Sequence, residues 1–245
     1  MRVAEVCLGA LSIVGFGSFV VASFLVGLRL LGIATRTGKA PELAIGAAFL
    51  AGGGLGYGLI VLAFALHAFS APVMPIAVLV GNTSASCGAI ALAFGIWRIF
   101  RPADRWPLAL TAVIVALLVV SFVGRLRNVA VVPAPAFVFW TFTIGSVASY
   151  AWSAFESLRF HAMLRRRMRI GLANADIARR FLLWGVAGSA AVGIHVCSAA
   201  NRFLDPDTIH PALLTVQAAL GLGAASGIWF AFFPPHRSRR TALSE

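Results

Sequence analysis

The sequence predicts an all-α membrane protein that crosses the bilayer several times. Of its 245 residues, 60% are hydrophobic and 11% are charged, and the mean hydropathy is +0.92, whereas about a quarter of a soluble domain is charged. Seven nearly uncharged stretches are long enough to cross a hydrocarbon core of about 30 Å as helices, which needs roughly 20 residues. These stretches are 6–28, 43–66, 73–97, 107–124, 133–155, 181–201 and 211–233.

Each stretch has features that fit a membrane helix. The stretch 6–28 is longer than the apolar region of a signal peptide, which is about 7 to 15 residues, so we expect a retained helix. The stretch 43–66 follows Pro41 and Glu42, a proline and an acid that favour the first turn of a helix. Several of the later stretches carry tryptophan near one end, as is typical of the interface between lipid and water: Trp97, Trp106, Trp184 and Trp229.

Residues 51–58, AGGGLGYG, are unusually rich in glycine for the middle of a helix. They lack the GxGxxG pattern and the preceding strand of a nucleotide-binding loop. They do contain glycines four residues apart, as does the pair Gly223 and Gly227. In lipid this spacing lets two helix backbones approach closely, which is the interpretation we favour. The alternative is a locally unwound helix whose amides line a cavity.

The basic residues are concentrated on one side of the predicted bundle. The segments after the first, third and fifth stretches, together with the C-terminal residues, hold 16 of the 20. By the positive-inside rule the N-terminus is outside and the C-terminus cytoplasmic, so we expect a multi-pass protein of the cell (inner) membrane. Topology and anionic lipid at the cytoplasmic face explain the net charge of +12, and no nucleic-acid partner is expected. The remaining four basic residues are Arg2, Arg125, Arg127 and Arg202.

The first three predicted helices resemble the last three. GIWRIFRP (95–102) and GIWFAFFP (227–234) both end a helix with the pattern GIWxxFxP, and LHAFSA (66–71) matches IHVCSA (194–199). A single linking helix lets both halves point the same way, so we predict seven transmembrane helices in a 3+1+3 parallel internal repeat. We expect the whole chain, 1–245, to form one transmembrane domain. Its parts are the first repeat 1–102, the linking helix 103–128, the second repeat 129–235 and a basic cytoplasmic tail 236–245.

This number and order of helices resembles the SWEET and PQ-loop sugar transporters and, more loosely, the microbial rhodopsins. The resemblance lies in the layout alone. The sequence has no Pro-Gln pair of the PQ-loop type, and its last helix has no lysine that could hold retinal. Retinal is therefore not expected, and the resemblance implies no site residue.

Two groups of polar residues are candidates for a ligand site. His67 and His195 are equivalent in the repeat and near the outer face, where Asn82, Ser198 and Gln217 are expected at similar depth. Polar residues inside a membrane often have a function, although histidine at a helix end also fits the headgroup region. The second group is a stripe on the fifth stretch that faces either a cavity or neighbouring helices. It consists of Thr143, Ser146, Ser149, Tyr150 and Ser153.

Metal and enzyme chemistry have weaker support. Imidazoles on different helices could hold a haem iron or a transition metal, with His67, His195 and His210 as ligands. The sequence lacks close motifs such as HxxxH and HExxH, so no cofactor is our first expectation. It also lacks the GxSxG motif of a serine hydrolase, and we do not expect an enzyme.

The positions of the acidic residues indicate whether transport could be coupled to an ion. All of them are expected in loops, in tails or near helix ends, with Glu156 paired to Arg159. Without a carboxylate at mid-membrane, an ion-coupled pump lacks its key residue. We therefore expect an uncoupled facilitator, or a binding protein, for a small uncharged solute, with a polar pocket open to the outside. The alternatives are a sensor that signals through a cytoplasmic protein docked on the loop 161–178, and a haem or metal redox protein using His67 and His195.

Overall fold

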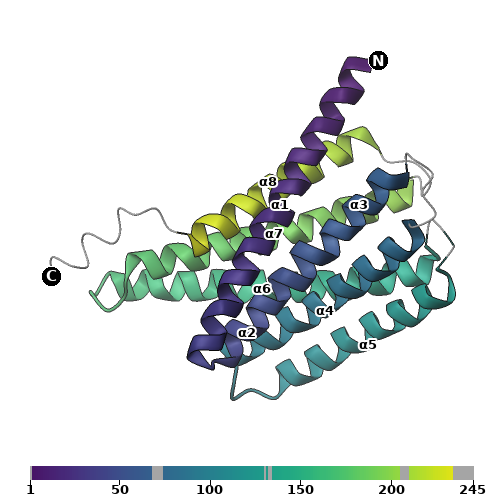
Figure 1. Cartoon of the computed structure of the whole chain (residues 1–245). Coiled ribbons are helices and arrows are strands. Elements are labelled where there is room, and N and C mark those ends of the chain that lie inside the picture. Colours follow the sequence, from purple (N-terminus) through teal and green to yellow (C-terminus); the bar gives the residue numbers. More distant parts are fainter. Residues whose placement is uncertain (1, 68–73, 130, 132–133, 205–209, 234–245) are drawn as a thin grey trace.

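The computed structural model describes residues 2–67, 74–129, 131, 134–204 and 210–233. These residues form helices and no strands, in seven rods that lie side by side (Figure 1). The second rod has three consecutive parts, α2 (Ala40–Ala47), the π-helix η1 (Ala48–Tyr57) and α3 (Gly58–His67). The other rods are α1 (Arg2–Thr37), α4 (Met74–Phe100), α5 (Trp106–Arg127), α6 (Ala136–Met168), α7 (Ala175–Leu204) and α8 (Pro211–Phe232).

Six of the rods are long and apolar enough to cross a membrane, so the chain is a multi-pass integral membrane protein. The exception is α6, because serine, threonine and aromatic residues replace aliphatic ones along its first half. Its hydroxyl groups are turned towards the other helices, where Thr143, Ser146, Ser149 and Ser153 are all buried. The predicted stripe therefore faces the bundle, and a seventh span at α6 stays a prediction.

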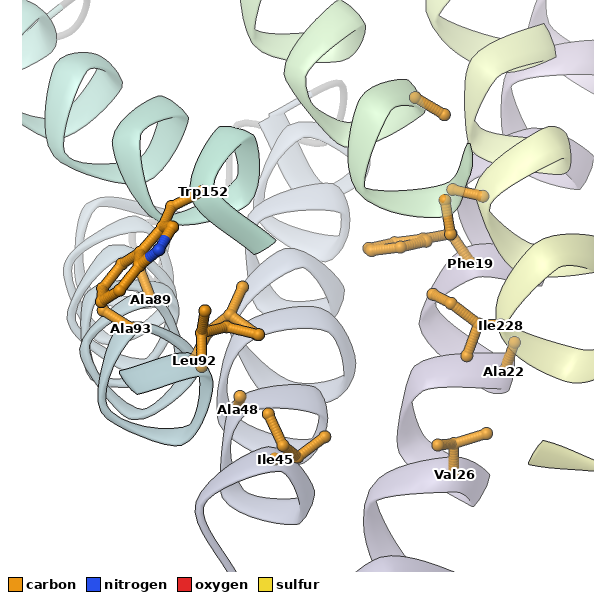
Figure 2. Close-up of a cluster of buried hydrophobic side chains, with 14 of the residues drawn as sticks. Phe19, Ala22, Val26, Ile45, Ala48, Ala89, Leu92, Ala93, Trp152 and Ile228 are labelled. Carbon is orange, nitrogen blue, oxygen red and sulfur yellow. The ribbon is translucent and has the colours of Figure 1, made fainter. Parts of the chain in front are cut away.

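Rods that follow one another in the chain pack against one another, and α1 closes the ring on α8. In addition α4 contacts α6, which leaves α5 at the edge of the bundle (Figure 1). Apolar side chains from all seven rods form the core, part of which Figure 2 shows. Among them are Phe19 and Val26 of α1, Ile45 of α2, Leu92 of α4 and Ile228 of α8.

The turns lie at two opposite ends of the bundle (Figure 1). We call one of them the basic end, because its turns 38–39, 101–105 and 169–174 carry most of the basic residues found outside the helices. The other is the far end. Gly38 and Gly171 have φ values of 68° and 72°, a conformation that residues with a Cβ rarely adopt, so glycine allows these two turns at the basic end. The tail 236–245 lies outside the described residues.

The segment 161–178 is mostly helical, which corrects the expectation of a loop. Helix α6 continues to Met168 and α7 begins at Ala175. Arginine favours helices, and arginines in a last turn complement the negative end of the helix dipole, as Arg165, Arg166 and Arg167 do here. A hydrogen bond of 2.7 Å between His161 Nδ1 and the Ala178 carbonyl joins the two helices. They form a hairpin that extends past the neighbouring helix ends (Figure 1).

The glycine-rich segment is η1, whose π-helical backbone is wider than that of an α-helix. A Cβ added to Gly52 would lie 3.4 Å from Gly88 Cα of α4, and one added to Gly56 would lie 2.7 Å from the Ala85 backbone nitrogen. Close helix packing is thus confirmed at these positions, whereas a Cβ added to Gly223 would meet nothing within 4 Å. The helix is widened here and not unwound.

Candidate functional site

The only two tyrosines of the chain meet at one histidine inside the bundle. Tyr57 ends η1, Tyr150 lies on α6 and His195 lies on α7. Tyr57 Oη and His195 Nε2 are 2.8 Å apart, a hydrogen bond whose direction depends on the tautomer of the ring. The ring centroids of Tyr150 and His195 are 5.7 Å apart. We call these three residues the Tyr–His cluster.

Further aromatic rings pack around the Tyr–His cluster and make its surroundings apolar. The ring centroids of Phe142 on α6 and His195 are 6.3 Å apart, and those of Phe19 on α1 and Tyr57 are 5.8 Å apart. His195 is 5% exposed. Four rods thus hold the Tyr–His cluster in place, and its polar atoms are surrounded by apolar surface.

A small cavity of about 40 Å³ lies beside the cluster, with Tyr150 and Ser153 in its wall. A cavity needs only about 10–15 Å³ for one water molecule, so there is room for a few waters or a very small solute. Ser153 Oγ is buried and has no hydrogen-bond partner among the described residues. Ser153 therefore brings to the cavity wall a buried hydroxyl group that can both donate and accept a hydrogen bond.

Aromatic side chains close the cavity towards the basic end. Phe49 and Trp184 line it, and both contact Phe232, with ring centroids 5.6 Å and 6.2 Å apart. Phe100 lies 6.3 Å from Trp184 and extends this layer. On the second rod Phe49 lies nearer the basic end and Tyr57 nearer the far end. The cavity thus lies between this aromatic layer and the Tyr–His cluster, of which Tyr150 lines it.

The structure brings some members of the two predicted groups of ligand residues together and separates others. Tyr150 and His195 lie at the Tyr–His cluster, and Ser146 and Ser149 are buried on α6 near them. Ser149 Oγ donates to the Gly145 carbonyl at 3.1 Å, so its proton is already used.

The other predicted ligand residues lie elsewhere. Gln217 Nε2 of α8 donates to Ser198 Oγ of α7 at 2.8 Å, which joins these two helices. Asn82 lines a different pocket, between α4, α5 and α6. The described members of the two groups are thus divided between the Tyr–His cluster, the contact of α7 with α8, and the pocket between α4, α5 and α6.

The three histidines predicted as metal ligands do not come together in the described part of the chain. His195 lies level with Tyr57, whereas His67, the last residue of α3, is about 15 Å further along the rod at a rise of 1.5 Å per residue. The side chain of His67 lies outside the described residues. His210 is exposed at the start of α8. No group of three His, Cys, Asp or Glu gathers among the described residues, and haem or metal binding stays a prediction.

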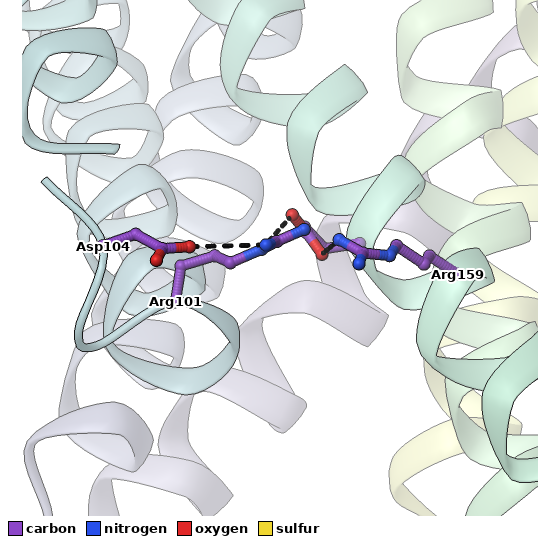
Figure 3. A network of polar contacts seen from close by, with 4 residues as sticks. Arg101, Asp104 and Arg159 are labelled. Carbon is purple, nitrogen blue, oxygen red and sulfur yellow. Dashed lines mark hydrogen bonds and ion pairs between the residues drawn. The ribbon is translucent and has the colours of Figure 1, made fainter. Parts of the chain in front are cut away.

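A second polar cluster lies near the basic end, around Glu156 of α6. Arg101 Nε donates to Glu156 Oε1 at 2.9 Å and its Nη1 donates to Asp104 Oδ2 at 3.3 Å (Figure 3). The hydrogen bond with Glu156 raises the pKa of Arg101. The predicted pair with Arg159 is confirmed at 3.8 Å, but Glu156 is 3% exposed, so it lies in the protein interior, which the sequence analysis did not predict.

The sequence analysis also missed Tyr57, the residue that binds His195. One signal was available: both of the chain's tyrosines fall within apolar stretches, where a hydroxyl needs a partner. No protein-family model, curated protein or solved structure matches this chain.

Proposed function

We propose that this protein binds a small, uncharged, hydrogen-bonding solute inside the bundle and lets it cross the membrane without coupling to an ion. The observation that carries this proposal is the cavity beside the Tyr–His cluster, where Ser153 Oγ has no partner among the described residues. An unpaired buried polar group costs about 1–3 kcal/mol, which a bound solute recovers by hydrogen bonding to it. None of the described residues that line the cavity is charged, which favours an uncharged solute.

The proposal includes seven spans in a parallel 3+1+3 repeat, with α6 as the fifth span and α5 as the linking helix. Exchanging the two repeats would convert the contact between α1 and α8 into the contact between α6 and α4, and both contacts are present. The basic end faces the cytoplasm by the charge rule. A solute would then enter between two three-helix units.

For a solute to cross, the Tyr–His cluster on the far-end side of the cavity and the aromatic layer on its basic-end side must open in turn. The far-end closure contains a single hydrogen bond, between Tyr57 and His195, and the closure at the basic end consists of aromatic contacts around Trp184. A cavity of about 40 Å³ restricts the solute to a few heavy atoms. Urea and glycerol are suitable probes of this class.

Stopped-flow light scattering on proteoliposomes tests the proposal. We expect urea or glycerol to enter proteoliposomes faster than protein-free liposomes, without any ion gradient. Ser153→Leu, which fills the cavity, should remove the difference, and Val186→Leu on the exposed face of α7 should keep it. Equal rates with and without protein for both solutes would contradict the proposal, as would full activity of Ser153→Leu.

A sensor is the second candidate, and the hairpin of α6 and α7 favours it. The hairpin extends past the other helices at the basic end (Figure 1), where a partner protein could reach it. The same cavity would then bind a ligand without transport. Solute binding to the detergent-purified protein, measured by calorimetry and unaccompanied by flux, would select the sensor.

A further inference from the structure

A second pocket, of about 60 Å³, lies between α4, α5 and α6 towards the far end. It contains a positive charge, Arg125, in the last turn of α5. Its wall also has an amphipathic character, with polar groups from α4 and phenylalanines from α5 and α6. The lining residues are Asn82, Thr83, Ser86, Ser121, Phe122, Arg125, Val138, Phe139 and Phe142.

Arg125 is only partly bonded in this pocket. Its Nη1 donates to the Val131 carbonyl at 3.3 Å, and its buried Nε has no hydrogen-bond partner among the described residues. The ion pairs of the described residues involve Arg101 and Arg159 near the basic end, not Arg125. Arg125 is half-buried and no acidic side chain pairs with it among the described residues, so a negatively charged group is the partner that complements this site.

The neighbouring polar groups show how such an anion would be held. Thr83 and Ser86 donate their hydroxyl protons to carbonyls of their own helix. Asn82 Nδ2 donates one of its two protons to the Val78 carbonyl at 3.0 Å, which leaves the second free. An anionic oxygen would therefore be bound by Arg125 and Asn82, from two different helices.

The rest of the pocket is suited to an apolar body. Phe122 is 39% exposed on the outer surface of α5, next to other exposed apolar residues of that helix. Phe139 and Phe142 complete the apolar wall. We propose that this pocket binds a phosphate or carboxylate group carried on an apolar body, with the charged group at Arg125 and the body over Phe122. The ligand is either an anionic phospholipid of the bilayer or a free amphiphilic acid.

Native mass spectrometry of the full chain in detergent tests this site, with phosphatidylglycerol and phosphatidylcholine added at equal concentration. We expect phosphatidylglycerol to be retained preferentially. Arg125→Gln should weaken its retention roughly tenfold, since charge-assisted hydrogen bonds are lost. Arg127→Gln is the matched control, because Arg127 is exposed two residues further along the same helix, and Arg125→Lys should recover part of the binding.

Octanoate distinguishes the two sources of the anion. If octanoate displaces phosphatidylglycerol from the wild type, the site accepts free amphiphilic acids, and if it does not, the site is specific for lipid. No preference for phosphatidylglycerol, or equal loss in Arg125→Gln and Arg127→Gln, would overturn the proposal. Should Arg125→Gln fail to fold, Asn82→Ala decides, because unchanged retention in that variant would reject the pocket.

Discussion

Helix α6 carries two buried polar clusters that lie one turn apart and are built differently. At Glu156 every charge is opposed, because Arg101 donates to the carboxylate at 2.9 Å and Arg159 lies 3.8 Å away. At Ser153 the groups are neutral, and the buried hydroxyl of this cavity-lining residue has no partner among the described residues. A buried charge must be paired for the fold to be stable, whereas a neutral hydroxyl can stay open at a moderate cost. The first cluster therefore holds helices together, whereas the second is the one to which the proposed function assigns the solute.

The largest effect on stability is expected from Glu156→Gln. The substitution keeps the shape of the side chain but leaves Arg101 without its main partner. We expect the free energy of unfolding to fall by about 2–3 kcal/mol, less than for a fully buried pair because the side chain of Arg101 is 24% exposed. The apparent melting temperature in detergent measures the loss.

Asp104→Asn is the control for that substitution, since Asp104 is 43% exposed and its ion pair is weak. It should lower stability by less than about 1 kcal/mol. Solute permeation per folded protein should stay unchanged in both variants. A loss of permeation in Glu156→Gln without a loss of stability would remove the distinction between the two clusters.

Gly88→Ala should have the next largest effect on stability. A methyl group at this position would overlap the backbone of Gly52 in η1, and overpacking of this kind costs about 1–3 kcal/mol. Gly223→Ala is the matched control, because nothing lies within 4 Å of its added methyl group. The melting temperatures of the two variants, measured by thermal unfolding, show how much stability depends on the close contact of Gly88 with Gly52. Equal melting temperatures would contradict the importance of this contact.

The positions of the helices could be predicted closely from the sequence. The stretch 107–124 corresponds to α5 (Trp106–Arg127) and 211–233 to α8 (Pro211–Phe232), because the thickness of the bilayer sets the length of an apolar helix. Side-chain contacts between distant helices could not be predicted in this way. The bond between Tyr57 and His195 depends on the widened backbone of η1 and on the rotation of α7 about its axis.

The burial of Glu156 shows the same limit for charged residues. Local spacing predicted its pair with Arg159, which lies three residues further along the same helix. The stronger partner, Arg101, comes from the turn after α4 and is 55 residues away in sequence. The sequence does not reveal that α4 packs on α6. No pattern in it therefore distinguishes this buried carboxylate from an exposed one.

Tyr57→Phe tests the Tyr–His cluster, the neutral polar group beside the cavity. The variant loses its hydrogen bond with His195, and stability should fall by about 1 kcal/mol. In the proposed pathway this bond lies between the cavity and the far end, so we expect faster urea or glycerol permeation in proteoliposomes when it is absent. Tyr150→Phe is its counterpart in the cavity wall, and it should slow permeation. Identical rates in the two variants would show that neither hydroxyl controls passage.

The smallest loss of stability, and the sharpest separation of the two clusters, is expected from Ser153→Ala. Its buried hydroxyl has no partner among the described residues, so removing it should not lower the free energy of unfolding and should raise it by up to about 1–3 kcal/mol, the cost of an unpaired buried polar group. Permeation should nevertheless fall, because the solute loses a hydrogen bond in the cavity. Ser149→Ala is the control, since that hydroxyl is bonded to its own helix and should leave permeation unchanged. If Ser153→Ala lowered stability like Glu156→Gln while permeation stayed constant, the hydroxyl at Ser153 would be structural, and both clusters would serve only to hold α6 in the bundle.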